Sequence, residues 1–300
     1  MTIAGLFVGE ERKLRFFWRA ILFILVGIAL QPALHPLYDW VVARYRIDDS
    51  GLSATSIALG ETANFIIAFI PTALFALYER RSIGSYGMPI AKALSANTFE
   101  GFLVGIVFAG AVAIGMLALG GMQVHGLALS GRALAASGLA WLGANAIVGI
   151  AEELWFRGYL LRALWRSIGF WPASLTIAAL FAAIHYFFKP GENIWDVITL
   201  VAFSLLCCFT VLRTGSLWFA VGFHAAFDFM QFFVIGTPNG TLIPKGRMLD
   251  VTFKGPAWIN GGVLGTEASV LMYPMFVLAG LYVWRRYRPA AATTLSPPSQ

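Results

Sequence analysis

Long apolar runs separated by short polar segments make up most of the chain. Eight of these runs come close to the roughly 20 residues that a helix needs to cross a lipid bilayer. The polar segments between them are too short for a soluble domain. We therefore predict one all-α bundle of about eight transmembrane helices over residues 20–288. The predicted spans are Phe16–Leu37, Ile57–Tyr78, Phe99–Leu119, Leu134–Leu154, Trp171–Phe188, Ile194–Leu212, Leu217–Ile235 and Ala268–Trp284.

The composition agrees with a membrane protein. Hydrophobic residues make up 59% of the chain and charged residues 12%, whereas soluble domains are roughly 45–50% apolar. The formal net charge of +6 invites a nucleic-acid partner. However, the basic residues lie in short clusters between apolar runs, which is typical of loops that meet anionic lipid headgroups. We therefore expect contact with the lipid bilayer and no nucleic-acid partner.

The distribution of basic residues predicts how the bundle sits in the membrane. With the N-terminus inside, 14 of the 21 Lys and Arg residues fall on the cytoplasmic side and 7 on the other. Because cytoplasmic loops are enriched in Lys and Arg, we expect both termini in the cytoplasm. Residues 1–19 predict a cytoplasmic interfacial segment, and residues 289–300 predict a disordered tail. The segment Gly236–Thr266 is long enough to pack over a cavity as a cap.

Three charged residues, Glu152, Glu153 and Arg157, follow the apolar part of the fourth span. An isolated charge at bilayer depth costs from about 2.5 to more than 10 kcal/mol, so such residues face a protein interior or a water-filled cavity. Glu153 and Arg157 lie four positions apart and meet on one helix face, which predicts a supporting ion pair. Glu152 points about 100° away and has no local partner. It is therefore the stronger candidate for a functional role.

A hairpin between the fourth and fifth helices would bring a histidine to the depth of Glu152. With a turn near Ser167–Phe170, Glu152 and His185 each lie 16.5 positions from the centre of the turn. At about 1.5 Å of rise per residue, both are roughly 25 Å from that turn. The seventh span adds His224 and Asp228, four positions apart and on one helix face. We therefore predict a polar site between helices four, five and seven.

Two chemistries suit such a site. In the first, Glu152 acts as a general base and His185 helps to hold a water for attack on a peptide carbonyl. His224 and Asp228 then stabilise the oxyanion. In the second, histidines and carboxylates bind Zn²⁺, which lowers the pKa of its bound water to about 7. Because the chain has no HExxH motif, we favour the route without a metal or other cofactor and keep zinc as the alternative.

Four further acidic residues lie in or near the spans. Glu100, Asp196 and Glu267 are interpreted as residues of the membrane boundary. Glu61 lies within the second span and has no such explanation. It is a candidate to line the same cavity.

Three ordered motifs point to a family. The sequence EELWFR, which begins at Glu152, fits EExxxR; FAAIH, from Phe181 to His185, fits FxxxH; and FHAAFD contains HxxxD from His224. Together, inside apolar spans, they resemble the motifs of the CPBP family. This family comprises the type II CAAX prenyl protease and bacterial Abi-type intramembrane proteases. The resemblance covers about residues 134–235.

The resemblance implies roles for six residues by motif position. Glu152 and His185 would activate the water, while His224 and Asp228 would form the oxyanion site, although many family members have Asn at the position of Asp228. The remaining motif members, Glu153 and Arg157, would support the site. Cleavage of prenylated CAAX tails belongs to the eukaryotic branch and is not carried over. The expected location is a bacterial inner (plasma) membrane.

We therefore predict an intramembrane endopeptidase that hydrolyses a peptide bond of a membrane-anchored protein or peptide. Two alternatives stay open. In a proton-coupled transporter, Glu152, His185, His224 and Asp228 would form a proton relay. In a catalytically idle membrane scaffold or immunity protein, the pocket would bind a partner.

Overall fold

A computed structural model describes residues 7–8, 13–189, 191–240 and 242–288. Within these residues, eight helices are long and apolar enough to cross a membrane, which confirms the predicted all-α polytopic bundle. The chain is an integral membrane protein. The predicted tail 289–300 lies outside the described residues. So does most of the predicted interfacial segment 1–19, although its last residues already belong to the first long helix.

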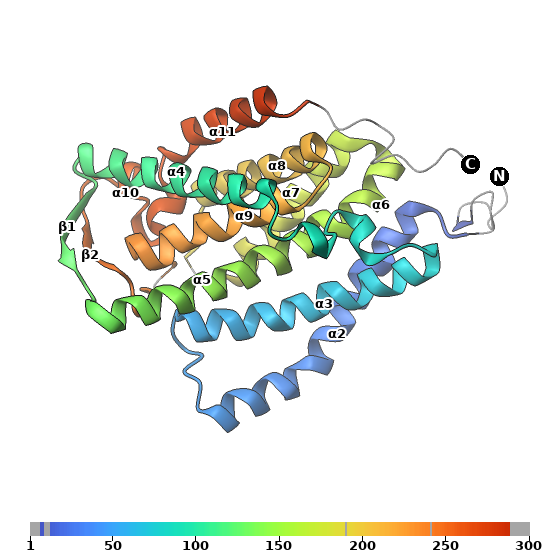
Figure 1. The fold of residues 1–300 in the computed structure, drawn as a ribbon, viewed down its shortest axis with the longest axis horizontal. Helices are drawn as coiled ribbons and strands as arrows, with labels where there is room; N and C mark the ends of the chain where they lie inside the picture. Colours follow the sequence, from blue (N-terminus) through green and yellow to red (C-terminus); the bar gives the residue numbers. More distant parts are fainter. Residues whose placement is uncertain (1–6, 9–12, 190, 241, 289–300) are drawn as a thin grey trace.

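Most of the long helices run in roughly the same direction, whereas α2 runs obliquely to them, and a short two-stranded sheet lies at the end of the bundle opposite to α6 (Figure 1). The elements, in chain order, are α2 (Phe16–Tyr45), α3 (Ala54–Glu79), η1 (Ile83–Tyr86), η2 (Ile90–Lys92), α4 (Ala96–Ala118), β1 (Met122–Leu127), α5 (Gly131–Glu153), η3 (Leu154–Gly158), α6 (Tyr159–Ile168), α7 (Phe170–Phe188), α8 (Ile194–Thr214), α9 (Trp218–Asp228), η4 (Phe229–Ile235), β2 (Leu249–Phe253), α10 (Ala257–Asn260), η5 (Gly262–Ala268) and α11 (Met272–Arg286).

The predicted fourth span, Leu134–Leu154, is the apolar part of a longer helical element. It continues past Leu154 through the π-helical turn η3 into α6, so the whole element covers Gly131–Ile168. A second π-helical turn, η4, follows α9. Each π turn begins directly after a motif carboxylate, Glu153 or Asp228. Because π turns inside helices occur frequently at functional sites, both turns indicate that this part of the bundle is a candidate site.

Close backbone contacts hold α9, which is buried along its whole length. A Cβ atom on Gly222 would lie 2.1 Å from the carbonyl oxygen of Thr98 in α4. On the other side, a Cβ atom on Gly149 of α5 would lie 2.7 Å from the carbonyl oxygen of Val221. Small residues allow transmembrane helices to approach this closely. The HxxxD face of α9 is therefore held between α4 and α5.

Replacing Gly222 with Ala should test this packing. The added methyl group overlaps a backbone carbonyl, so α4 and α9 must separate, and we expect the free energy of unfolding to fall by about 1–3 kcal/mol. Thermal unfolding of the detergent-purified protein measures the change. The matched control is Gly143→Ala in α5, where a Cβ atom meets nothing within 4 Å; it should be neutral or stabilising. Equal effects of the two substitutions would contradict the packing argument.

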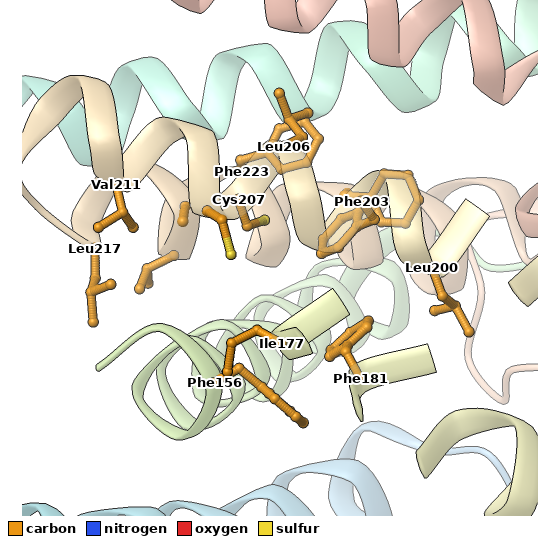
Figure 2. Close-up of a cluster of buried hydrophobic side chains, with 14 of the residues drawn as sticks. Phe156, Ile177, Phe181, Leu200, Phe203, Leu206, Cys207, Val211, Leu217 and Phe223 are labelled. Carbon is orange, nitrogen blue, oxygen red and sulfur yellow. The ribbon is translucent and has the colours of Figure 1, made fainter. Parts of the chain in front are cut away.

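The apolar core packs α9 against η3, α7 and α8. The ring of Phe181 in α7 contacts those of Phe156 in η3 and Phe203 in α8, and Phe203 in turn contacts Phe223 in α9; Figure 2 shows these side chains in one cluster with Cys207 of α8. All five side chains are buried. The core thus joins the helices that carry the three motifs.

The sheet was not predicted. β1 and β2 pair antiparallel, with a register shift between Val124 and Gly126. β2 lies within the predicted cap Gly236–Thr266 and anchors it to the segment after α4. Asn239 of the same segment lines the cavity described below. The predicted cap is thus tied to β1 by its strand and contributes one described residue, Asn239, to the lining of the cavity.

Candidate active site

The ion pair predicted on the fourth span is present. A nitrogen of Arg157, Nη1, donates to Oε1 of Glu153 at 3.2 Å, and both side chains are fully buried. The guanidinium also lies over the ring of Phe181, 4.8 Å from its centroid. Its Nε and Nη2 atoms have no hydrogen-bond partner within the described residues. Glu153 therefore supplies the main charge compensation of a buried cation.

Glu153 has a second partner that the sequence did not predict. Nδ1 of His224 donates to Oε1 of Glu153 at 2.9 Å, across a sequence separation of 71 residues. The other ring nitrogen of His224, Nε2, lies 3.7 Å from Oε2 of Glu152 and 3.6 Å from Oδ2 of Asp228. Because Glu153 binds Nδ1–H, it orients the ring so that Nε2 faces these two carboxyl groups. His224 is thus the centre of three carboxyl groups.

The hairpin that should carry His185 to this depth is also present, since α6 ends at Ile168 and α7 begins at Phe170. Nδ1 of His185 donates to the carbonyl oxygen of Phe181 at 2.8 Å. In the neutral ring this leaves the Nε2 lone pair free to accept a hydrogen bond. No hydrogen bond or ion pair joins Glu152 to His185 in the part of the chain that the structure describes.

One cavity nevertheless connects all four motif side chains. Its volume is about 180 Å³, and Glu152, His185, His224 and Asp228 line it. A buried water needs only about 10–15 Å³ on the same measure, so several waters fit. Oε2 of Glu152 is buried and lacks a hydrogen-bond partner among the described residues. The arrangement offers a carboxylate and two imidazoles to water in a confined polar space.

Other helices also contribute to this cavity. Glu61 of α3 lines it, as the sequence allowed. Asp196 and Glu267, which the sequence interpreted as boundary residues, line it too, together with Lys189. Glu100 instead contacts Tyr282 and Arg286 on α11. No periodicity within one span could reveal that Asp196 and Glu267 line the same cavity, because this depends on how α8 and η5 pack.

Lys189 gathers the acids at one end of the cavity. Its Nζ atom lies 2.5 Å from Glu267, 3.0 Å from Glu192 and 4.0 Å from Asp196. Burial lowers the pKa of Lys189, but the charges of Glu267, Asp196 and Glu192 outweigh this effect and raise the pKa above its ordinary value. Lys189 therefore stays an ammonium ion.

The ligands for the zinc alternative would come from the histidines and carboxyl groups that line this cavity. Among the described residues, no group of three or more His, Cys, Asp or Glu side chains could hold a metal ion. The donor set around His224 consists of one imidazole and carboxyl groups at ion-pair distances. In this arrangement the side chains do not surround a metal ion, and zinc binding stays an alternative to the metal-free route.

Comparison with known proteins finds similarity over the same region that contains the three motifs. Residues 134–230 match the model of the Rce1-like family, described as type II CAAX prenyl endopeptidase Rce1-like. A stretch of 154 residues is 30% identical to the uncharacterized protein YyaK of Bacillus subtilis (strain 168). The match covers 48% of this chain and 48% of YyaK, so the chain spans about half the length of this curated relative.

The matched region contains the whole motif set, from Glu152 to Asp228, that lines the cavity. The structure brings the helices of this region together around one polar cavity. Residues 134–230 therefore have the sequence pattern of the Rce1-like family, and this region of the chain is similar to type II CAAX prenyl endopeptidases.

Proposed function

We propose that the protein is an intramembrane endopeptidase that hydrolyses a peptide bond of a membrane-associated protein or peptide. The main support is that the four motif side chains, which come from three helices, line a single cavity. The Rce1-like match over the same residues supports a CAAX-type protease at the level of the family. The substrate need not be prenylated.

The proposed nucleophile is a water held between Glu152 and His185. The carboxylate of Glu152 takes a proton from this water as the oxygen attacks the peptide carbonyl. The free Nε2 atom of His185 accepts a hydrogen bond from the same water and helps to orient it. When the tetrahedral intermediate collapses, protonated Glu152 gives the proton to the leaving amine nitrogen. This sequence balances without a metal or other cofactor.

The proposed oxyanion site is His224 with Asp228. Once protonated, His224 would donate from Nε2, the nitrogen that faces the cavity, toward the developing oxyanion. Glu153 holds the opposite side of the ring through the 2.9 Å hydrogen bond. Asp228 lies 3.6 Å from Nε2, where it can orient the ring or, when protonated, donate to the oxyanion.

We further propose that the protein resides in a bacterial plasma membrane with both termini in the cytoplasm. The excess of Lys and Arg in the loops of that side supports the orientation. The similarity to a Bacillus subtilis protein supports the bacterial setting.

Comparing the proteomes of cells that express the wild-type protein or Glu152→Ala tests the function and searches for the substrate at once. We expect a membrane-associated protein to be cleaved only by the wild type, because loss of a general base costs about 10²–10⁴ in rate. Purified protein should then cleave that substrate in proteoliposomes. Glu100→Ala is the matched control, because Glu100 pairs with Arg286 and Tyr282.

Three outcomes would contradict parts of this proposal. Cleavage retained by Glu152→Ala, with both variants extracted at equal yield, would refute the assigned base. Proton flux in proteoliposomes without a peptide product would favour the proton-coupled transporter. Stoichiometric zinc in the active preparation, measured by elemental analysis, would overturn the metal-free route.

A further inference from the structure

The end of the cavity around Lys189 has more negative than positive charge. Three carboxyl groups, those of Glu192, Asp196 and Glu267, surround this one ammonium group. If all are ionised, the cluster has an excess of two negative charges in a buried place. Such an excess is costly, because buried charges need compensation by opposite charge and hydrogen bonds.

The shortest of these contacts do not involve Asp196. Lys189 lies 2.5 Å from Glu267 and 3.0 Å from Glu192, but 4.0 Å from the nearest oxygen of Asp196. The side chain of Asp196 has no exposed surface and lines the cavity. Neither of its oxygens has a hydrogen-bond partner within the described chain. The oxygens of Glu192 also lack such a partner, but Glu192 does not line the cavity, and Glu267 accepts a hydrogen bond from Lys189. Asp196 is therefore the carboxyl group of the three that can meet a group entering the cavity.

Thr199, a neighbour of Asp196 on α8, is a second buried polar residue of this kind. Thr199 lies three positions after Asp196, is 2% exposed and lines the same cavity. Its hydroxyl oxygen also lacks a hydrogen-bond partner among the residues that the structure describes. An unpartnered buried polar atom costs about 1–3 kcal/mol. This end of the cavity thus offers acceptor atoms in one place, on one helix face.

The chemistry of the missing partner follows from these atoms. Water can donate to these oxygens, but it does not compensate the excess of carboxyl groups over the one ammonium group, so the partner that fits best combines hydrogen-bond donors with positive charge. The described residues also do not form a metal-binding group of three or more His, Cys, Asp or Glu. An ammonium or guanidinium group meets both requirements, since each is a charged donor without acceptor atoms.

We propose that Asp196 and Thr199 form a second subsite of the cavity, which binds a basic side chain of the substrate. This inference rests on the proposed function, because the peptide that brings the basic side chain is the one that is cleaved. Glu152 and the subsite line the same cavity, so the basic residue binds next to the scissile bond. The protease would therefore select membrane-associated substrates with Lys or Arg beside the cleaved bond.

A binding experiment tests the subsite without needing any cleavage. The probes are n-butylammonium and n-butylguanidinium, which resemble the ends of Lys and Arg side chains, with 1-butanol as the uncharged control. Thermal unfolding of the detergent-purified protein is followed as each probe is titrated. Both cations should raise the unfolding midpoint of the wild type, and butanol should not. Asp196→Asn should weaken the apparent affinity for both cations at least tenfold, because the contact is charge-assisted.

Two further variants sharpen this result. Asp39→Asn removes an exposed carboxylate of α2, whose partner is His35, and should leave cation binding unchanged. Thr199→Val keeps the shape of the side chain and should weaken cation binding two- to fivefold. It also keeps the proposal testable if Asp196→Asn does not fold. Equal midpoint shifts by butanol and butylammonium, or cation binding unchanged in Asp196→Asn or Thr199→Val, would overturn the subsite.

A cleavage arm separates the subsite from the proposed function. Substrate peptides with Lys or norleucine at each position around the scissile bond should differ at least tenfold in kcat/KM at one position. In Asp196→Asn this ratio should fall close to one. Cation binding without any peptide cleavage would refute the protease while the subsite stands. Cleavage that ignores Lys at every position would refute the subsite while the protease stands.

Discussion

Replacing Glu153 with Leu should lower the free energy of unfolding by about 3–5 kcal/mol. The substitution removes the only carboxylate within salt-bridge distance of Arg157 among the described residues, yet the guanidinium remains fully buried. Two of its nitrogens already lack partners in this part of the structure. The ring of Phe181 compensates a cation only in part, by roughly 2 kcal/mol when desolvated. Unfolding of the detergent-purified protein by heat or denaturant measures the loss.

Two matched variants show whether the uncompensated charge of Arg157 causes the loss of stability. The double variant Glu153→Leu/Arg157→Met removes both charges and should regain most of the lost stability, since apolar replacements of buried ion pairs are often neutral or stabilising. Glu152→Leu, at the adjacent position, should cost less than about 1 kcal/mol, because this side chain is 17% exposed and its partner His224 keeps Glu153 and Asp228. If Glu153→Leu is as stable as the wild type, the charge compensation assigned to Glu153 is wrong.

The same double variant should remain almost inactive although it is stable. Without Glu153, His224 loses the acceptor of its 2.9 Å hydrogen bond, so neither the tautomer nor the ring orientation is held. We expect cleavage to fall by about 10²–10⁴, the range for loss of acid–base or tautomer control. The decrease should appear in kcat with little change in KM, because Glu153 does not line the cavity that receives the substrate.

This result separates two roles of Glu153. A residue that only neutralises Arg157 would give an active enzyme as soon as stability returns. A positioning residue for His224 would not. Recovery of full cleavage in the stable double variant would therefore refute the positioning role and leave Glu153 as half of a structural ion pair.

The helices could be predicted from the sequence because each must satisfy its own backbone hydrogen bonds in lipid and present about 20 apolar residues. All eight predicted spans correspond to helices of the structure. The Glu153–Arg157 pair could be predicted for a similar reason, since residues four apart on one helix meet whatever surrounds them. The equal depth of Glu152 and His185 needed one further assumption, an unbroken helical hairpin. The α6–α7 turn is present, but the π-helical turn η3 interrupts the first arm between Glu152 and that turn.

Contacts between helices were beyond such local rules. The hydrogen bond between His224 and Glu153 depends on how α9 packs against α5, where Gly149 allows the close approach. The cluster of Lys189 with Glu192, Asp196 and Glu267 joins the end of α7 to α8 and η5. The short strands β1 and β2 are too brief and irregular to give a period-two signal.

The sequence by itself determined that the chain spans a membrane, where its helices lie and which polar residues need an explanation. The tertiary structure decided which of these residues share one cavity and which carboxylate orients His224. The physical reason is that the length and periodicity of an apolar run are properties of a single helix and can be read from its sequence. The partner of a buried charge, by contrast, is selected by packing between helices that are distant in the chain.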